Sequence, residues 1–550
     1  MKAPIAVAPR PAVPTIAGRR VTWDRAAIFA TGAVNLPELL ADVPGVTNYN
    51  AGFILAPSAT GWYGQPGRVR VFLDGVELDA LDLREGGTAD LQNIQLWSLE
   101  EVAVERAAGE LRVFLRSWRV RYTPAQTRTD ITTGSEQTNL YRGFFGKRMN
   151  SGAVIQFAAQ QFSTTSFRTA GDGDALAAFG RVGVARGRLT VDAVGTRYGR
   201  NRAATFRYVV GSTPLDNDAI GSFEGVDAVG YVRAAWGNAD STGFWAQALW
   251  SAQRHAEEGD SVAGADTART VSQYVAMAGV MRWGARLTAT ARYRVLPGTG
   301  GRFAPAVRAS WERQWFDVAV SAEEAGPDST RRLDAIASVR PFPWLHLGAA
   351  HSIHTPEDAA LGGPARTTSR AEAGVRVLGR WLTAGAVQRS TGRLLGLPVF
   401  DTLFVPIAGS AVPSATGLEA GVSGQVWRRF FVDWRGTRWP DGTPYTPAVE
   451  SHTVLSWRPD TRKRFTRGDF DFSATLTHDY RGRAIFPAVA GGVQVAEGAG
   501  YWGGGIEMRI GSARIFWVNR NAAGKIYETV PGYLMPRLVQ LYGLRWEFWN

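Results

Sequence analysis

The sequence predicts an all-β transmembrane barrel of about 22 antiparallel strands, preceded by a small α/β domain. From about residue 126 onward, short segments alternate apolar and polar residues with period two, and hardly a helical pattern lies between them. The connections between these segments alternate between tight turns and long polar links. The chain also contains 63 Gly, 20 Trp, 26 Phe and 15 Tyr, which favours strands with turns and aromatic anchors over helix bundles.

The segment from 286 to 295 shows the alternation most clearly. Its apolar positions are Leu287, Ala289, Ala291, Tyr293 and Val295, and its polar positions are Arg286, Thr288, Thr290, Arg292 and Arg294. A slip of one residue in the strand register would turn the arginines toward lipid. Each arginine near the bilayer midplane would then destabilise the barrel by roughly 2–4 kcal/mol, so we expect the apolar face to point outward. The same reasoning on neighbouring segments predicts a lumen lined by Arg286, Arg292, Arg294, Arg308, Asp317 and Glu323.

The connections decide between a membrane barrel and a soluble sandwich, which share this alternation. Tight turns are expected near residues 150, 187, 284, 314, 343, 380 and 429, and long links over 162–175, 199–222, 254–270, 353–369, 391–415, 436–451, 481–499 and 521–538. Short periplasmic turns opposite long outer loops are typical of outer-membrane barrels. Tryptophans beside the tight turns fit an interfacial belt, or ordinary packing at hairpin ends. The last segment, 541–550, resembles the C-terminal assembly signal of such barrels.

The link from 393 to 414 is too apolar to extend freely into water. We expect it to fold over the mouth of the barrel or to dock on a partner, through Leu397, Val399, Phe400 and Phe404. Packing of these side chains against one another is the alternative. Replacement of Phe400 and Phe404 by Ser is expected to alter partner or ligand binding and to leave barrel assembly intact.

The front of the chain has a different pattern. Residues 1–23 are rich in Pro, Ala and Arg and are expected to be extended or disordered. Residues 24–125 mix a helix-like LPELLADVPGV with the strand VRVFLDGVEL and its Asp-Gly turn, and then with the strands EEVAVERAAG and LRVFLRSW. The sequence therefore predicts three regions: 1–23, a compact domain over 24–125, and a barrel over 126–550.

Three motifs in the 24–125 domain resemble the plug domain of TonB-dependent receptors. They are the helix and PGV turn (Leu39, Leu40, Pro44, Gly45, Val46), the DGV strand (Val69, Val71, Leu73, Asp74, Gly75, Val76), and Ile94 followed by the strand from Leu99 to Arg106. The resemblance implies that this domain fills the barrel lumen and that its movement, coupled to the periplasmic TonB protein, admits a scarce ligand such as a metal chelate, oligosaccharide or peptide. It also implies that Glu101, Glu105 and Arg106 reach the barrel wall.

The sequence departs from the family pattern at three places, and at one of them GWYGQPGR offers only Arg68 where the family has an Arg-rich plug region after the PGV turn. Ala107, Ala108 and Gly109 stand where the family has Arg-Gly-Pro, and the only candidate for the TonB-binding segment is RRVTWD at 19–24. The alternative function is therefore a barrel of the same fold that has lost TonB coupling and serves as a surface scaffold or assembly partner for other outer-membrane or surface proteins. The retained plug favours transport. A general diffusion porin is disfavoured because such channels have fewer strands and no such domain.

Charge and the rarest residues exclude other classes. The formal net charge is +12, but the basic residues are almost all Arg and form no block, so we do not expect nucleic-acid binding. The excess of 61 basic over 49 acidic residues is expected to line the lumen, which favours an anionic ligand, or to bind lipopolysaccharide phosphates at the outer rim. The expected partners are thus outer-membrane lipid, lipopolysaccharide and TonB.

Catalytic and metal-binding patterns are not found. The chain has no Cys and 6 His, and it lacks HExxH, paired CxxC, nucleophile-elbow and phosphate-loop motifs. We therefore expect no enzyme, no cofactor and no metal site. The expected location is the outer membrane of a Gram-negative-type bacterium, although MKAPIAVAPRPAVP lacks the apolar core of a secretory signal.

Overall fold

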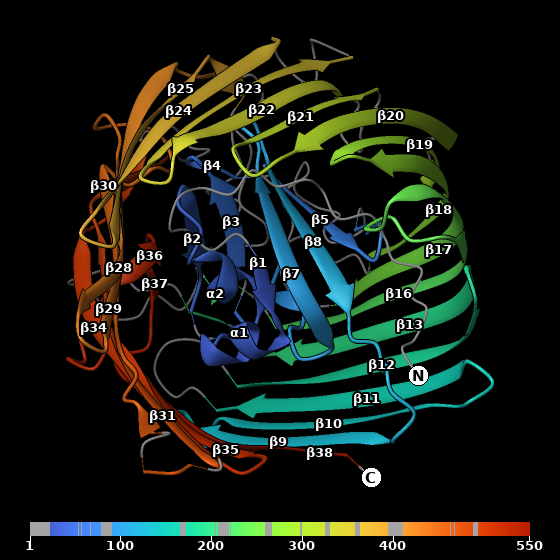
Figure 1. Cartoon of the computed structure of the whole chain (residues 1–550). Helices are drawn as coiled ribbons and strands as arrows, with labels where there is room; N and C mark the ends of the chain where they lie inside the picture. The colour runs from blue at the N-terminus through green and yellow to red at the C-terminus, as the bar shows by residue number, and fades with distance from the viewer. Residues whose placement is uncertain are drawn as a thin grey trace.

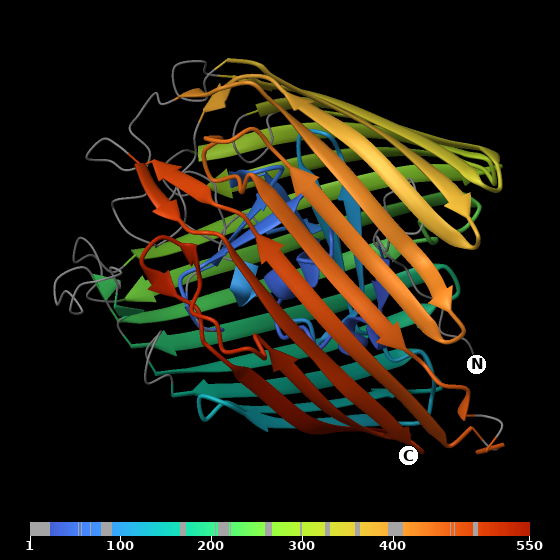
Figure 2. The same cartoon turned by 90° about the vertical axis from the view of Figure 1, so that its left-hand side faces the viewer.

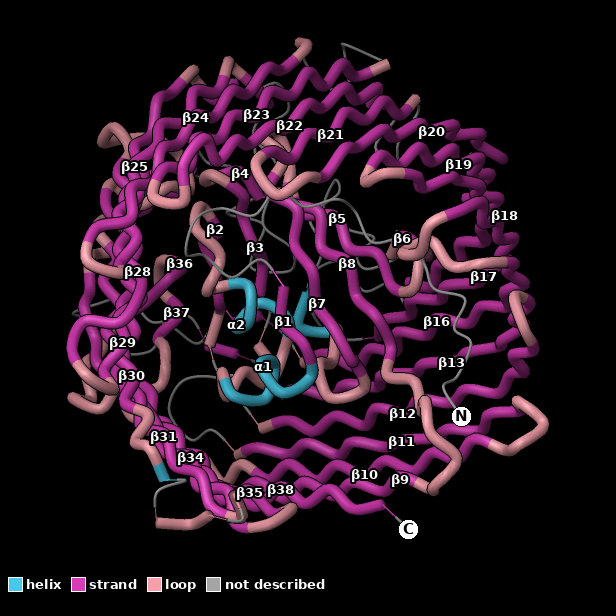
Figure 3. The backbone as a smooth tube through the Cα atoms, viewed as in Figure 1, coloured by secondary structure: helices cyan, strands magenta, loops and turns pink. Residues whose placement is uncertain are grey.

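The structure is a computed structural model of the whole chain, and a barrel encloses a small domain in it (Figure 1). It describes residues 22–549, apart from 53, 57, 67, 79–90, 166–171, 204, 207–218, 221, 259–266, 297–299, 325–329, 358–363, 394–410, 462–463, 467 and 488–492. Strands make up nearly all of the regular structure (Figure 3). No helix among the described residues is long and apolar enough to cross a membrane.

The barrel closes from 22 antiparallel strands, so the predicted fold class is confirmed. Each strand pairs with the next barrel strand along the chain, and the last strand pairs with the first, with Leu544 opposite Ile131. The strands are β9 (Gln126–Gly134), β10 (Asn139–Arg148), β11 (Ala153–Thr164), β12 (Gly173–Arg186), β13 (Leu189–Arg202), β16 (Phe223–Trp236), β17 (Gly243–Glu258), β18 (Thr267–Arg282), β19 (Ala285–Leu296), β20 (Gly300–Glu312), β21 (Phe316–Glu323), β22 (Thr330–Phe342), β23 (Leu345–Pro356), β24 (Arg366–Val377), β25 (Arg380–Arg389), β28 (Ala415–Trp427), β29 (Phe430–Arg438), β30 (Val449–Trp457), β31 (Phe470–Arg481), β34 (Ala499–Ile510), β35 (Ala513–Arg520) and β38 (Val539–Trp549).

Tight turns gather at one end of the barrel, which we call the short-turn end (Figure 2). The turns at Trp283–Gly284 and Leu378–Gly379 have two successive residues with positive φ, of 51° and 77° and of 50° and 78°. This is the backbone of the primed turns that match the twist of paired strands. Trp283, itself the first residue of its turn, is 68% exposed.

The opposite end, which we call the long-link end, carries the long connections. In the described parts of the chain, four of these connections contain a small hairpin of their own: β14 (Thr205–Phe206) with β15 (Ala219–Ile220), β26 (Gly392–Arg393) with β27 (Ala411–Val412), β32 (Ala484–Pro487) with β33 (Val493–Ala496), and β36 (Glu528–Val530) with β37 (Tyr533–Leu534). Leu397, Val399, Phe400 and Phe404 lie outside the described residues.

The side chains of β19 separate by face. Leu287, Tyr293 and Val295 are exposed on the outside, whereas Arg292 and Arg294 are buried on the lumen side. This follows from the period of two, because successive residues of a strand point to opposite faces of the sheet. An apolar outer surface and a charged lumen result.

The predicted plug occupies the lumen as residues 22–118 (Figure 1). Its elements are β1 (Thr22–Asp24), α1 (Arg25–Ala30), α2 (Leu36–Leu40), β2 (Val46–Asn50), β3 (Ser58–Trp62), β4 (Gln65–Pro66), β5 (Val69–Leu73), β6 (Val76–Glu77), a 3-10 turn (Leu91–Asn93), β7 (Leu99–Arg106) and β8 (Leu111–Ser117). One sheet has the order β1-β7-β8-β5-β6, and β2, β3 and β4 form a second. Asp24 and Asn35 cap the two helices through their side chains, which accept backbone N–H bonds.

The start of the plug includes part of the segment that the sequence assigns to the extended N-terminal region. Thr22 and Trp23 pair with β7 as the edge strand β1, and Trp23 is buried in the plug core. The edge of β7 supplies hydrogen-bond partners for the backbone of β1, and the core of the plug buries the indole ring of Trp23. Half of the candidate TonB-binding segment RRVTWD is therefore part of the plug sheet.

Candidate functional site

A cluster of buried ion pairs lies between the plug and the barrel wall. On the plug, Arg70 of β5 and Glu77 of β6 face each other at 2.7 Å. Arg70 also binds Glu323 of β21 with two hydrogen bonds of 2.8 and 3.0 Å. Glu77 binds Arg292 of β19 at 2.7 Å and Arg294 of the same strand. These four strands therefore meet in one alternating set of cations and carboxylates.

A second set continues along β7 and β8. The Glu105 carboxylate accepts hydrogen bonds from Arg308 of β20 at 2.9 Å and from Arg112 of β8 at 3.0 Å. Arg112 extends to Ser321 at 3.0 Å and also binds Asp334 of β22. In addition, Glu110 and Arg332 of β22 lie 3.0 Å apart. Because charged hydrogen bonds are the strong ones, these contacts fix the plug against β20–β22.

Arg106 makes a third contact, on another part of the wall. Its guanidinium donates to Glu419 of β28 at 3.1 and 3.2 Å and to Glu372 of β24 at 3.5 Å. It also donates to the hydroxyl of Tyr63 at 3.1 Å. All of these side chains are almost fully buried, so water competes little for the ion pairs of Arg106.

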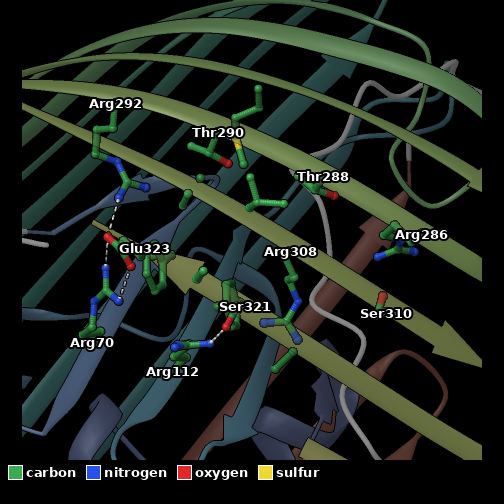
Figure 4. A pocket seen from close by; sticks show the side chains of 18 of the residues that line it. Arg70, Arg112, Arg286, Thr288, Thr290, Arg292, Arg308, Ser310, Ser321 and Glu323 are labelled. Atoms are coloured by element: carbon green, nitrogen blue, oxygen red, sulfur yellow. Dashed lines mark hydrogen bonds and ion pairs between the residues drawn. The ribbon is translucent and has the colours of Figure 1, made fainter. Parts of the chain in front are cut away.

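An open cavity lies between the plug sheet and β18–β21. Its empty space, including that at its mouth, is about 1130 Å³. Figure 4 shows Arg70, Arg292 and Glu323 at one end and Arg286 and Ser310 at the other. Since Arg286 and Arg292 are six positions apart on β19, the cavity follows the wall for about 20 Å. Arg286 lies next to the short-turn end, so the cavity extends from there to the ion pairs of Arg70.

The walls of the cavity combine charged and apolar groups. The rings of Phe72 and Phe114 stack at 5.0 Å on the plug side, and both are only partly buried. Arg112, Arg308 and Arg286 face the same space. The cavity can therefore contact an apolar group and a negatively charged one at once.

Burial and charge act in opposite directions on the plug carboxylates. Burial alone would raise the pKa of Glu77, but Arg70, Arg294 and Arg292 outweigh it and lower that pKa below its ordinary value. The same holds for Glu110, whose pKa is lowered by Arg112, Arg70 and Arg332. These carboxylates are therefore ionised at neutral pH, and their ion pairs are fully formed.

Apolar packing holds the plug on the other side of the barrel. A buried cluster joins Phe29, Val76 and Trp97 of the plug to side chains of β10–β13 and β16–β18, such as Phe144 and Leu249. A further cluster joins the plug to β10–β13 and β38. This side also has a buried ionic contact, because Asp74 of the plug binds Arg181 of β12 at 3.2 Å and Tyr231 of β16 at 2.7 Å. The attachment here is therefore largely apolar with one charged cluster, whereas the attachment beside the cavity is ionic.

The long links close over the plug tip. Tyr49 at the tip of the β2–β3 hairpin packs with Tyr445, Phe486 and Tyr533 of three different links, and all four rings are fully buried. The backbone N–H of Asn50 donates to Thr529 at 2.8 Å. In the described part of the chain, the plug tip is thus covered from the long-link end.

The site residues expected from the sequence fall into three groups. Arg286, Arg292, Arg308, Glu323 and Glu101 line the cavity, and Arg294 lies beside it as a partner of Glu77. Glu105 and Arg106 bind the wall as described above. Asp317 is buried on the wall and binds Arg340 at 2.8 Å and Ser338 at 3.2 Å, away from the cavity.

Sequence reasoning missed the plug residues Arg70, Glu77, Glu110 and Arg112. Their signal was present, because charged residues stand between apolar ones in VRVFLDGVEL and in GELRVFL. A strand buried on both faces would lack them. Among the described residues, no group of three or more His, Asp or Glu side chains could hold a metal ion.

Comparison with known proteins agrees with this geometry. The family described as "TonB-dependent Receptor Plug Domain" matches residues 15–113. No curated protein sequence matches the chain.

Solved structures match the fold over nearly the whole chain. The FrpB iron transporter from Neisseria meningitidis (F5-1 variant) is 10% identical, with a TM-score of 0.71 over 96% of this chain and 100% of that one. The ferric-catecholate import receptor Fiu from E. coli K12 is 12% identical, with a TM-score of 0.68 over 99% and 100%. The siderophore receptor PirA from Acinetobacter baumannii is 10% identical, with a TM-score of 0.69 over 96% and 98%. The chain thus joins a TonB-dependent receptor plug domain to a closed 22-strand barrel, and it has the fold of the TonB-dependent receptors.

Proposed function

We propose that the protein takes up a scarce ligand, such as a metal chelate, across the outer membrane of a Gram-negative-type bacterium, driven by TonB. The observation that carries the proposal is the two-sided attachment of the plug. Apolar clusters, together with the Asp74–Arg181 ion pair, hold it to β10–β18. Arg70, Glu77 and Glu105 hold it to β19–β21 through ion pairs next to a cavity, and no buried apolar cluster of the described residues joins it to those strands. A plug attached in this way fills the barrel at rest and can be moved on one side.

The polar attachment supports movement for a physical reason. Parting two apolar surfaces exposes them to water at about 25 cal/mol per Å². Ion-paired groups that separate are instead rehydrated, or they find other polar partners, in a lumen that admits water. Force applied at the short-turn end would therefore part the plug from β19–β21 before it parts the plug from β10–β18.

TonB coupling is tested by capture. The full chain in detergent is passed over the immobilised periplasmic domain of TonB, and the same is done with a chain lacking residues 1–21. We expect the full chain to be retained and the shortened chain to pass through, because TonB-binding segments are gripped as an added strand. Equal retention of both chains would place the TonB contact elsewhere. Retention of neither would favour the scaffold function.

Uptake is tested without knowing the ligand. Cells that carry or lack the protein grow in the same medium, and mass spectrometry compares the compounds that remain. Compounds depleted only when both the protein and TonB are present are its ligands. The absence of any such compound across media poor in iron, sugars and peptides would contradict the proposal.

A further inference from the structure

The link between β30 and β31 is longer than the other connections at the short-turn end. It has 12 residues between Trp457 and Phe470, whereas the other links at this end have two to six. Its sequence, RPDTRKRFTRGD, contains five basic and two acidic residues, and the structure describes all of them except 462–463 and 467. The link therefore brings an excess of positive charge to one part of the barrel rim.

Hydrogen bonds hold the described part of the link in a compact turn. The backbone N–H groups of Arg464 and Phe465 donate to the carbonyl of Thr461 at 3.0 and 2.9 Å. The backbone N–H of Gly468 donates to the carbonyl of Phe465 at 2.9 Å. The hydroxyl of Thr461 donates to the carbonyl of Phe470 at 2.8 Å, which fixes the turn to the start of β31.

The turn lies on the outward face of the barrel. Phe465 is exposed, and the centre of its ring lies 4.7 Å from that of Phe470. Phe470 is paired with Ile510 of β34, which is exposed on the outer surface, and directly paired residues share one face of a sheet. In Figure 3 the link lies outside the ring of strands, beside β31. Phe465 therefore extends the apolar outer surface at this end.

A row of aromatic side chains continues along the same rim. Ring centres lie 5.6 Å apart for Trp427 and Phe430, 6.3 Å for Phe430 and Trp457, and 5.7 Å for Trp457 and Phe472. Exposed aromatic residues at the end of a membrane barrel mark the level of the lipid headgroups. The link therefore lies at the headgroup level.

Four exposed arginines lie beside this row, and we call them the basic patch: Arg428, Arg429, Arg458 and Arg464. They form no block in the sequence, but the two turns that carry them are neighbours, since the backbone N–H of Arg458 donates to the carbonyl of Arg429 at 3.1 Å. The guanidinium of Arg428 lies 4.9 Å from the ring centre of Trp427.

The carboxylates of the link offset only part of this charge. Asp460 binds Arg429 at 2.9 Å, and both side chains remain partly exposed to water. Asp469, at the end of the link, is exposed as well. Two carboxylates beside four arginines leave the patch positive.

We infer that the basic patch binds the phosphate groups of anionic phospholipids in the leaflet at the short-turn end, with Phe465 inserted among the first acyl-chain carbons. The inference rests on the proposed location in the outer membrane and adds a lipid partner to it. Short turns of outer-membrane barrels face the periplasm, so this leaflet is the inner one.

The chemistry of the patch fits a lipid phosphate. The planar guanidinium group donates two parallel hydrogen bonds to phosphate oxygens, and clustered basic residues are attracted to anionic lipid. Phe465 favours a lipid over an acidic soluble protein, because its ring stands on the face of the barrel that contacts the bilayer. An anionic phospholipid supplies both the negative charge and the apolar surroundings.

The test counts lipids bound to the full chain by native mass spectrometry. The protein is released from micelles with equal amounts of dioleoyl phosphatidylglycerol and dioleoyl phosphatidylcholine, which have the same acyl chains but differ in net charge. We expect phosphatidylglycerol adducts to exceed phosphatidylcholine adducts at least about fivefold, the factor that one basic residue near an anionic surface contributes. R428Q/R429Q/R458Q/R464Q should lower this ratio at least about threefold.

A matched control removes the same charge from other short turns. R186Q/R188Q/R282Q/R313Q also replaces four exposed arginines at the short-turn end, but these are spread over three turns. We expect it to keep most of the lipid preference. Heat-modifiable gel mobility verifies that each barrel is folded, and R458Q/R464Q replaces the fourfold patch variant if the latter does not fold.

A fluorescent label tests the position of the turn. Thr466 is exposed and the chain has no native cysteine, so T466C can be labelled alone with bimane. In nanodiscs that contain phosphatidylglycerol, a nitroxide on the lipid headgroup should quench this label. The quenching should weaken in the patch variant, because the turn is then no longer held against the headgroups.

Four results would overturn the inference: equal binding of the two lipids, the same loss of preference in the control, an unquenched label, or displacement of phosphatidylglycerol by an equal concentration of soluble polyglutamate. The measurements require neither TonB nor transport. Lipid preference without any TonB-dependent depletion of medium compounds would therefore count against the proposed uptake alone, and depletion without lipid preference would count against this inference alone.

Discussion

Gly109 donates its backbone N–H to the hydroxyl of Ser352 at 2.8 Å and so joins the β7–β8 turn of the plug to β23 of the barrel. A Cβ atom placed on Gly109 would lie 2.9 Å from the Cβ of Ser352. Disulfides have about 3.5–4.5 Å between Cβ atoms, so a shift of about 1 Å brings cysteines at these positions into bonding distance. The chain has no native cysteine that would compete.

The variant G109C/S352C is expected to block uptake when oxidised, because the disulfide then ties the plug to β23 and prevents the plug from moving away from this side of the wall. Addition of a reductant should restore it. The measurement is the TonB-dependent depletion of medium compounds by cells that carry the variant.

A second disulfide provides the control for this lock. Gly146 of β10 faces Val120, which follows the plug on its apolar side. The variant V120C/G146C is expected to keep uptake when oxidised, since that side stays attached. Equal loss of uptake in both oxidised variants would mean that the plug leaves the barrel as a whole. No loss of uptake in either variant would mean that the plug stays in place during transport.

Substitution of Arg106 tests the attachment on the β24 and β28 wall. R106A removes the guanidinium that Glu372 and Glu419 share, although Arg370 still lies 3.6 Å from Glu372. The plug should therefore be less stable in the barrel, by up to about 3–5 kcal/mol. Hydrogen exchange of the β7 and β8 amides should therefore be faster in intact R106A than in the intact wild-type protein. The triple variant R106A/E372Q/E419Q should recover part of the loss, and no recovery would show that Arg106 acts through packing.

The plug attachment should weaken in acid. The pKa values of Glu77 and Glu110 lie below their ordinary value of 4.5 in the folded protein, because the arginine charges outweigh burial. A lowered pKa contributes stability that is complete at pH values above the ordinary pKa and is lost as the pH falls toward the folded one. The protection factors of the plug amides, which correct for the intrinsic pH dependence of exchange, should therefore be constant from neutral pH to about pH 5 and fall below it. E77Q should reduce this fall, and an unchanged fall would assign it to other groups.

The two faces of β19 should respond differently to a new charge. Ala289 is exposed on the outside of the barrel, whereas Thr290 faces the cavity. A289R is expected to lower the stability of the barrel in lipid by about 2–4 kcal/mol and T290R by much less. Urea titrations of folding into lipid vesicles measure both. A larger effect of T290R would contradict the assigned faces.

The sequence alone determined the barrel. Strand faces follow from a period of two, which the segment 286–295 displays without any tertiary information. The tight turns could be located partly because glycines such as Gly284 and Gly379 adopt the positive φ that these turns need. The plug was identifiable from three local motifs in their order, since each of them is a short stretch of chain.

The tertiary structure alone decided which charges meet. Arg70 and Glu323 are 253 positions apart, and Glu77 and Arg292 are 215 apart, so no local pattern pairs them. Their contact depends on how the plug is rotated within the lumen. That rotation is set by the shape of the apolar clusters against β10–β18, which are built from many residues distant in sequence. A strand reveals its inward face through its own period, whereas the partner of an inward charge depends on the packing of the whole plug.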